Sequence, residues 1–201
     1  MASALHADEP WRFGDSFATI LLSHGIGMGM YVKDRMFTGT SSSAAEFGHM
    51  CHLPGGSLCR CGRHGCIEAY AGDYGIWRKA TGGNPNEVPE KDFDPDTMAE
   101  LAGRARAGDE QAREAYLKAG EAIGHGLRSL FALLDPMPVA FVGSGAAAFD
   151  LMEPMIRQSL GQRGVGLSYE DPRLYCYPNE FELTRRGTVV TALNALDRNL
   201  Q

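Results

Sequence analysis

The sequence predicts a protein of the α/β class, in which short buried strands run into glycine turns and alternate with amphipathic helices. Apolar runs at Phe17–Leu22 and at residues 138–142 are each followed by a turn that contains glycine. Between them, apolar residues recur every three or four positions over residues 112–134, as on one face of a helix. The 201 residues are enough for one ordinary core, or one domain with a small appendage.

The N-terminal third is expected to combine a short helix with a small antiparallel sheet. Residues 2–7 predict the end of a helix that Pro10 stops. An antiparallel meander of two or three short strands follows, at residues 17–22, 30–32 and 36–37. A glycine turn at residues 23–29 joins the first strand to the second. Residues 39–65 are rich in Gly, Ser, Cys and His and predict irregular structure, before a helix from about Cys66 through Ala71.

The rest of the chain is expected to be mainly helical. Three prolines between residues 81 and 96 predict a surface connection. Asp96 is expected to cap a short helix that Gly108 closes, and Asp109 to cap the long helix over residues 112–134. The remaining elements are a buried strand at 138–143, a helix at 151–160, a strand at Leu174–Tyr177 and a last helix at 188–199.

Composition excludes several classes of function. The formal net charge is -6, and no cluster of Lys and Arg is present, which argues against a nucleic-acid surface. The apolar runs are too short to span a bilayer, which argues against a membrane protein. The first residues show neither a basic segment nor a long apolar stretch, so we expect no secretory signal and a soluble, cytoplasmic protein.

The cysteines are crowded into one segment. Cys51, Cys59, Cys61 and Cys66 fall within sixteen residues, whereas Cys176 stands alone. In a cytosolic chain of this size such crowding indicates metal binding rather than disulfides. Three thiolates and one imidazole form a closed shell that Zn²⁺ accepts in tetrahedral geometry. A closed shell has no open position for substrate, so the predicted zinc is structural.

Spacing alone leaves the fourth zinc ligand open. Cys59, Cys61 and Cys66 are fixed by their C-x-C-x4-C pattern, and the glycines within it allow the tight backbone that such spacing needs. Four nearby residues could complete the shell: His49, Cys51, His52 and His64.

Two glycine turns and a group of polar side chains have two interpretations each. The turn around Gly25, Ile26 and Gly27 and the turn at Gly143-Ser144-Gly145 can each cradle a nucleotide or simply reverse the chain. A second group consists of two carboxylates and an imidazole, at Glu46, His49 and Glu68. These can hold sugar hydroxyls, because a histidine bound to zinc through one nitrogen is aimed through the other. The alternative is a solvated glutamate beside an ordinary ligand histidine.

Three segments together resemble the signature of the ROK (repressor, ORF, kinase) family. They are LSHGIGMG from Leu22, AEFGH ending at His49, and CRCGRHGCIEAYAG from Cys59. The strong match covers residues 22–72, and weaker similarity continues through PVAFVGSG to the last helix. The resemblance implies an actin-like ATPase (ribonuclease H-like) fold with a zinc-binding loop at about residues 49–66. It also implies sugar kinases or sugar-responsive repressors as relatives.

The resemblance assigns roles to individual residues. It selects His49 as the fourth zinc ligand beside Cys59, Cys61 and Cys66. It assigns Glu46, His49 and Glu68 to the hydroxyls of a bound sugar. In members that use ATP with Mg²⁺, it assigns Gly25, Ile26 and Gly27 to the phosphates and Gly143, Ser144 and Gly145 to the adenosine.

Two departures from the family pattern bear on function. The Asp-x-Gly-x-Thr phosphate loop and the Asn-Asp pair with the catalytic base do not occur in the sequence. We therefore expect residues 1–201 to be the C-terminal ROK domain of a longer protein, with no catalytic residue of its own. In addition, Ser23-His24-Gly25 stands where kinases usually have Gly-Thr-Gly, which is closer to the repressors.

The expected function is therefore that of a regulator. The first hypothesis is a sugar-sensing, homodimeric C-terminal domain of a ROK transcriptional regulator of the N-acetylglucosamine/xylose repressor type. DNA contact would belong to an N-terminal domain outside this sequence. The second is the C-terminal half of an ATP-dependent, glucokinase-like sugar kinase, the one case in which ATP and Mg²⁺ are expected. The third is a zinc-stabilised interaction domain that has lost its ligand.

Overall fold

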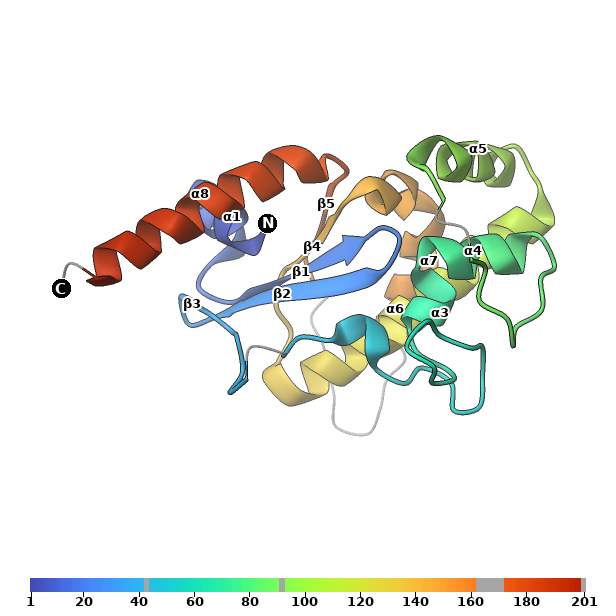
Figure 1. The fold of residues 1–201 in the computed structure, drawn as a ribbon, viewed down its shortest axis with the longest axis horizontal. Helices are drawn as coiled ribbons and strands as arrows, with labels where there is room; N and C mark the ends of the chain where they lie inside the picture. The colour runs from blue at the N-terminus through green and yellow to red at the C-terminus, as the bar shows by residue number, and fades with distance from the viewer. Residues whose placement is uncertain (42–43, 91–92, 162–171, 200–201) are drawn as a thin grey trace.

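A mixed five-stranded sheet forms the centre of the molecule, as drawn in Figure 1. The computed structural model describes residues 1–41, 44–90, 93–161 and 172–199. The strands are β1 (Phe17–Leu22), β2 (Ile26–Val32), β3 (Arg35–Met36), β4 (Val139–Val142) and β5 (Leu174–Tyr177). Their order is β3-β2-β1-β4-β5, with the first three antiparallel and β1, β4 and β5 parallel. The predicted α/β class is confirmed.

Helices cover both faces of the sheet (Figure 1). The helices nearest the sheet are α1 (Ala2–Asp8), α8 (Glu180–Asn199), α6 (Glu110–Leu134) and α7 (Phe149–Gly161). Strand β1 alternates between two clusters, as the period of two in a strand requires. Ile20 belongs to the large core with α6 and α7, whereas Phe17 packs with Leu5 of α1 and with Leu183 of α8.

The remaining elements lie at the end of the sheet where β1 and β4 finish, or beside it. They are α2 (Pro10–Phe13), η1 (Phe47–His49), α3 (Glu68–Ala71), α4 (Asp73–Ala80), α5 (Pro95–Arg106) and η2 (Ser144–Ala148). Figure 1 shows α3, α4 and α5 gathered at this end beside α6. Within the described ranges, no helix is long and apolar enough to cross a membrane.

The predicted glycine turn at residues 23–29 is wrong in extent. Strand β2 begins at Ile26, so that Gly27 pairs with Leu21 and Gly29 with Thr19. A Cβ at Gly29 would lie 3.3 Å from the Cβ of Ala2, because α1 packs directly on this part of β2. Close packing of a helix on a strand therefore accounts for Gly29, and the turn is limited to the three residues before Ile26.

The start of α5 also differs from expectation. The cap of α5 is Asp94, which accepts a hydrogen bond from Thr97 N at 2.7 Å, and not Asp96. Pro95 then occupies the first helical position, which suits its fixed φ and missing N–H. The cap at Asp109 is confirmed, with Ala112 N at 3.0 Å.

Two short helices and part of a long one were not predicted. Helix α2 begins at Pro10, and α4 follows α3 after one residue. Helix α8 begins at Glu180, eight residues before the predicted start at 188. Its apolar residues lie on more than one face, since Leu183 packs on the sheet cluster while Leu193 is exposed. Helical periodicity is therefore weak in this segment.

Helices α6 and α7 approach each other closely through glycines of α6. A Cβ at Gly120 would overlap the carbonyl oxygen of Met152. A Cβ at Gly124 would lie 2.6 Å from the Cβ of Ser159 and 3.0 Å from the carbonyl oxygen of Ile156. The small residues of α6 thus set the distance between these two helices and hold the layer behind β1 and β4 in place.

Candidate functional site

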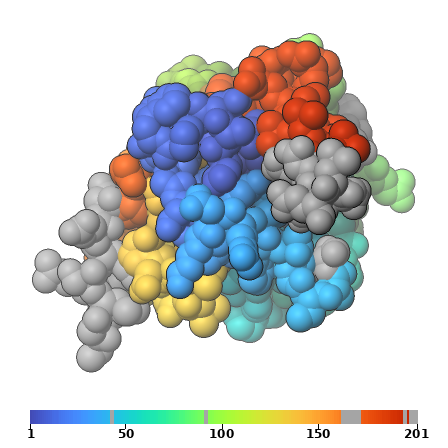
Figure 2. Space-filling view, turned by 90° about the vertical axis from the view of Figure 1, so that its left-hand side faces the viewer, coloured from blue at the N-terminus to red at the C-terminus, as the bar shows by residue number. Residues whose placement is uncertain are grey.

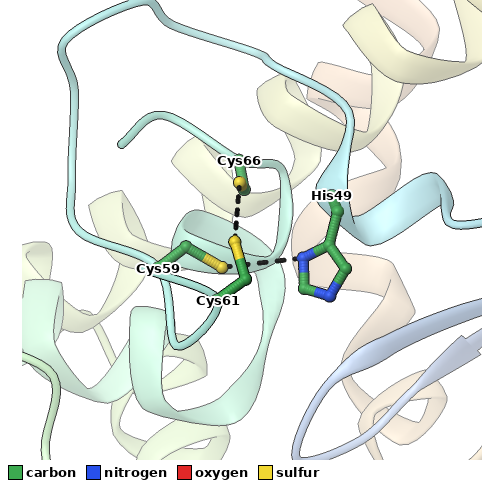
Figure 3. A group of neighbouring side chains, drawn as sticks. All are labelled: His49, Cys59, Cys61 and Cys66. Atoms are coloured by element: carbon green, nitrogen blue, oxygen red, sulfur yellow. Dashed lines mark hydrogen bonds between the residues drawn. The ribbon is translucent and has the colours of Figure 1, made fainter. Parts of the chain in front are cut away.

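Four side chains converge between η1 and α3. Figure 3 shows His49 from the end of η1, Cys59 and Cys61 from the following loop, and Cys66 just before α3. Their ligand atoms all lie within 4.8 Å of one another. The Sγ of Cys59 is 3.7 Å from Nδ1 of His49, and the Sγ atoms of Cys61 and Cys66 are also 3.7 Å apart.

These separations fit a tetrahedral metal site. Ligand atoms bound to zinc at ~2.3 Å lie about 3.8 Å apart at the corners of a tetrahedron. Three thiols and one imidazole are also the donor set of a closed zinc shell. The residues present therefore fit Zn²⁺, and they leave no fifth protein group in the cluster within the described part of the chain.

The structure separates His49 from the other three candidates for the fourth ligand. Cys51 is exposed and joins Cys66 through a backbone bridge. His52 turns toward α6, where its Nδ1 lies 3.1 Å from Nδ1 of His125. His64 is exposed and lies in a second backbone bridge, to Leu58.

The loop reaches this geometry through two glycines in the left-handed region. Gly62 has φ +83° and Gly65 has φ +84°. The N–H of Gly62 donates to the carbonyl of Cys59 at 2.9 Å, and the N–H of Cys59 donates to the carbonyl of Arg63 at 2.9 Å. A Cβ at Gly65 would overlap the carbonyl oxygen of Leu53. Glycine is required at these positions because other residues rarely adopt such angles.

The thiols of the cluster are not electrostatically equal. Burial acts to raise the pKa of Cys61, but hydrogen bonds from the backbone and side chain of Arg63 outweigh it and lower that pKa well below its usual value. Burial raises the pKa of Cys66, and its hydrogen bond with Cys61 raises it further. Arg63 thus favours a thiolate at Cys61, and a bound cation would favour thiolates at all three cysteines.

The residues predicted to hold a sugar fall into two environments. Because Nδ1 of His49 faces Cys59, its Nε2 points away from the cluster and lies 3.9 Å from Oε2 of the exposed Glu46 (Figure 3 shows the ring). Glu68 is instead buried. Its Oε2 accepts a hydrogen bond from Ile26 N at 3.2 Å, and its Oε1 accepts one from the hydroxyl of Tyr74 at 3.4 Å. Glu68 therefore joins the start of β2 to the cluster.

The two glycine turns lie close together, and one N–H group in each is already bonded. Gly25, Ile26 and Gly27 do not have positive φ, and the N–H of Ile26 is taken by Glu68. Gly143 has φ +103°, and its N–H donates to the carbonyl of Tyr177 at 3.1 Å. A Cβ at Gly145 would lie 3.0 Å from the carbonyl oxygen of Leu22, so this turn packs against the end of β1.

A cavity of about 330 Å³ lies between α5, η2 and the start of α4, with Ser144 and Gly145 in its wall. Among the described residues that line it, Arg106 is the only cation, and Asp150 holds its guanidinium at 2.6 Å and 2.9 Å. Asp73 and Asp96 also line it. These charges do not fit a polyphosphate, since the carboxylates would repel it.

Sequence reasoning did not identify Asp73 as a residue of interest. It is the first residue of α4 and is buried, although an acidic residue at the start of a helix is normally solvated. No local pattern distinguishes it, because its neighbours are distant in sequence: its N–H donates to the carbonyl of Ser23, and η2 and α5 line the same cavity.

Comparison with known proteins places the chain among relatives of two kinds. Residues 13–168 match the sequence pattern of the ROK family. Glucokinase of Streptomyces coelicolor is 32% identical over 157 residues, which cover 73% of this chain and 49% of that protein. The DNA-binding transcriptional repressor Mlc of Escherichia coli is 27% identical over 147 residues, covering 73% of this chain and 36% of the repressor.

Comparison with solved structures also finds a protein of the ROK family. The crystal structure of a ROK hexokinase from Thermus thermophilus is similar with a TM-score of 0.76 and 28% identity, over 98% of this chain and 63% of that chain. The chain spans about half the length of the glucokinase and about a third of the repressor. Kinases and repressors both match, so similarity does not separate the two activities. From the match over most of its length, the chain belongs to the ROK family.

Proposed function

We propose that this chain is the sugar-sensing, dimerising C-terminal domain of a ROK-family transcriptional regulator, with an actin-like fold over residues 1–201. The observation that carries the proposal is the orientation of His49. Its Nδ1 faces the thiols while its Nε2 points outward toward Glu46. A ring fixed at one nitrogen presents a directed donor beside a carboxylate acceptor, which suits the hydroxyl groups of a sugar.

The zinc loop, at about residues 49–66, has a structural role in this proposal. His49, Cys59, Cys61 and Cys66 would hold Zn²⁺, which when bound supplies a rigid anchor for the loop. Glu68 then supports the same anchor from behind through Ile26 and Tyr74. Sugar binding would shift the regulator between conformations, and DNA contact would belong to a segment outside this sequence.

The environment of the glycine turns favours a regulator over a kinase. A regulator needs to bind a sugar without a nucleotide, whereas phosphoryl transfer needs donors that hold the phosphates and a base at the acceptor hydroxyl. Here the N–H groups of Ile26 and Gly143 are already bonded, and Asp73 lines the adjoining cavity. These features support sensing without ATP.

The second candidate is the C-terminal half of an ATP-dependent sugar kinase. The 32% identity to Streptomyces coelicolor glucokinase favours it, because that value exceeds the 27% identity to the repressor Mlc. In this case ATP and Mg²⁺ would be required. Gly25, Ile26 and Gly27 would lie near the phosphates, and Gly143, Ser144 and Gly145 near the adenosine, after rearrangement of the present bonds.

Sugar binding by the zinc-loaded chain tests the proposal. We expect calorimetric titration with hexoses, pentoses and N-acetylhexosamines to reveal weak binding of at least one sugar, without ATP. Glu46→Gln should weaken that binding at least tenfold, and Glu100→Gln, an exposed change on α5, should leave it unchanged. Absence of binding across the panel would contradict the proposal. Sugar-dependent ADP release with ATP and Mg²⁺ would favour the kinase instead.

A further inference from the structure

Asp73 is a buried carboxylate without a hydrogen-bond partner in the described part of the chain. The residue is 5% exposed. Nδ1 of His24 lies 3.9 Å from its carboxylate, beyond hydrogen-bond distance, and that nitrogen lies 3.2 Å from Oγ of Ser23. Buried carboxylates are normally paired, because loss of hydration is costly. Burial accordingly raises the pKa of Asp73 to about 6.

The carboxylate belongs to a cavity in which the hydroxyl of Tyr116 and the guanidinium of Arg106 already have partners. Most of the wall is apolar, with Ile76, Met98 and Met152 among its residues. The hydroxyl of Tyr116 donates to the carbonyl of Met98 at 3.2 Å. The guanidinium of Arg106 is bonded to Asp150 and to the carbonyl of Ala147. A mainly apolar cavity with a buried, unsatisfied carboxylate is typical of a binding site for a donor-bearing ligand.

The charges that face Asp73 come from several elements. His24 in the β1–β2 turn and Arg60 in the metal loop stabilise its anionic form, whereas Glu180 at the start of α8 opposes it. Arg106 from α5 lines the same cavity but is neutralised by Asp150, and Asp96 adds another carboxylate at the edge. The lining therefore favours a cation over an anion.

We propose that this cavity binds a small organic cation, a protonated amine on a compact apolar body, and that the ammonium group pairs with Asp73. The apolar body is removed from water against the methionine and isoleucine walls, and the ammonium supplies the missing hydrogen-bond donors. A phosphate-bearing ligand is disfavoured by the same carboxylates. The site is separate from the Cys and His cluster. Ser144 and Gly145 in its wall are residues that the kinase alternative would place near adenosine, so this proposal rests on the chain acting as a regulator.

Isosteric probes test this assignment on the full, zinc-loaded chain. Benzylamine, charged throughout pH 5–7.5, is compared with benzyl alcohol and benzoate by titration at pH 7.5. We expect saturable binding of benzylamine, at least tenfold weaker binding of benzyl alcohol, and no binding of benzoate. Asp73→Asn should weaken the binding of benzylamine at least tenfold. Asp96→Asn, a change at an exposed residue of the same lining, should alter that affinity by less than twofold.

The dependence on pH provides a second test that needs no variant at Asp73. Affinity for benzylamine should fall several-fold from pH 7.5 to pH 5, as Asp73 takes up a proton. His24→Gln removes the imidazole that lies 3.9 Å from Asp73 and should preserve this dependence. Any of four results would overturn the proposal: no benzylamine binding, equal binding of the alcohol, full affinity in Asp73→Asn, or an affinity independent of pH.

Discussion

The burial of Asp73 has a consequence for the stability of the folded chain. Its pKa is raised to about 6 by burial, above the ordinary value of an aspartate, so the folded state binds the proton more tightly than the unfolded state. At low pH Asp73 is protonated and its burial does not reduce the stability of the folded chain. As pH rises through about 6, Asp73 becomes charged and its burial lowers the free energy of unfolding.

Asp73→Asn should consequently stabilise the chain at neutral pH. We expect the free energy of unfolding at pH 7.5 to increase by about 1–3 kcal/mol, because the amide carries no buried charge. The gain should be smaller at pH 5. Urea denaturation at both values, with zinc content checked, measures it. A variant that is less stable than the parent at pH 7.5 would show that Asp73 has a favourable partner.

The metal cluster predicts a sharp difference between two neighbouring cysteines. Cys61→Ser removes one of the four ligands, so the purified chain should lose its zinc and much of its stability, because metal binding is coupled to folding. Cys51→Ser is the matched control, since Cys51 is exposed and outside the cluster. Elemental analysis should find close to one zinc per chain in the parent and the control. Freshly purified parent without zinc would contradict the assignment.

Individual residues differed in how well sequence could predict them. Cys59, Cys61 and Cys66 are recognisable because eight residues contain all three ligands, and local spacing survives folding. The choice of His49 over His52 needed the family resemblance, since only the packed structure turns His52 toward His125. The burial of Asp73 is a tertiary property and leaves no local signal.

At the scale of elements, the approach of α6 to α7 depends on Gly120. Gly120→Ala should destabilise the chain by about 1–3 kcal/mol, because the added Cβ overlaps the carbonyl oxygen of Met152 and the backbone must move. Gly103→Ala is the control: on α5 nothing lies within 4 Å of its Cβ, so the change should stabilise by about 0.5–1 kcal/mol through helix propensity. Thermal and urea denaturation of both variants test this. Equal changes in stability for the two variants would contradict close packing of α6 on α7 at Gly120.

Elements were predictable where a local rule decided them. Strands β1 and β4 are buried on both faces and therefore appear as continuous apolar runs. The cap of α6 follows from Asp109 alone. The predicted cap of α5 at Asp96 was wrong, because Pro95 takes the first helical position and Asp94 before it is the cap. The start of β2 depended on packing against α1, which no local pattern contains.

At the scale of the whole molecule, charge predicts how the chain behaves toward DNA. The net charge of -6 and the absence of basic clusters in the sequence disfavour contact with phosphates. We expect this chain to leave operator-like duplexes unshifted in electrophoresis at moderate salt. Tight binding that weakens as salt increases would show that the chain carries a DNA surface of its own.

Helix α8 provides the apolar surface on which the expected dimer depends. Val189, Leu193 and Leu196 follow one another at helical spacing and are 55%, 56% and 60% exposed. Figure 2 shows the end of the molecule where α8 lies beside α1 and the β2–β3 hairpin, with α8 in red at the surface. Continuous exposed apolar residues of this kind usually mark a contact with another chain, and a two-fold axis would place one α8 against the other.

Light scattering should therefore give about twice the chain mass of 21.8 kDa at micromolar concentration. The double variant Val189→Glu with Leu193→Glu should return the chain to a monomer, since it places charges in the apolar contact. Leu133→Glu, an equally charged change at the 81% exposed end of α6, should remain dimeric. A parent chain of 21.8 kDa would exclude self-association under these conditions. A dimer that persisted in the double variant would place the interface on another face.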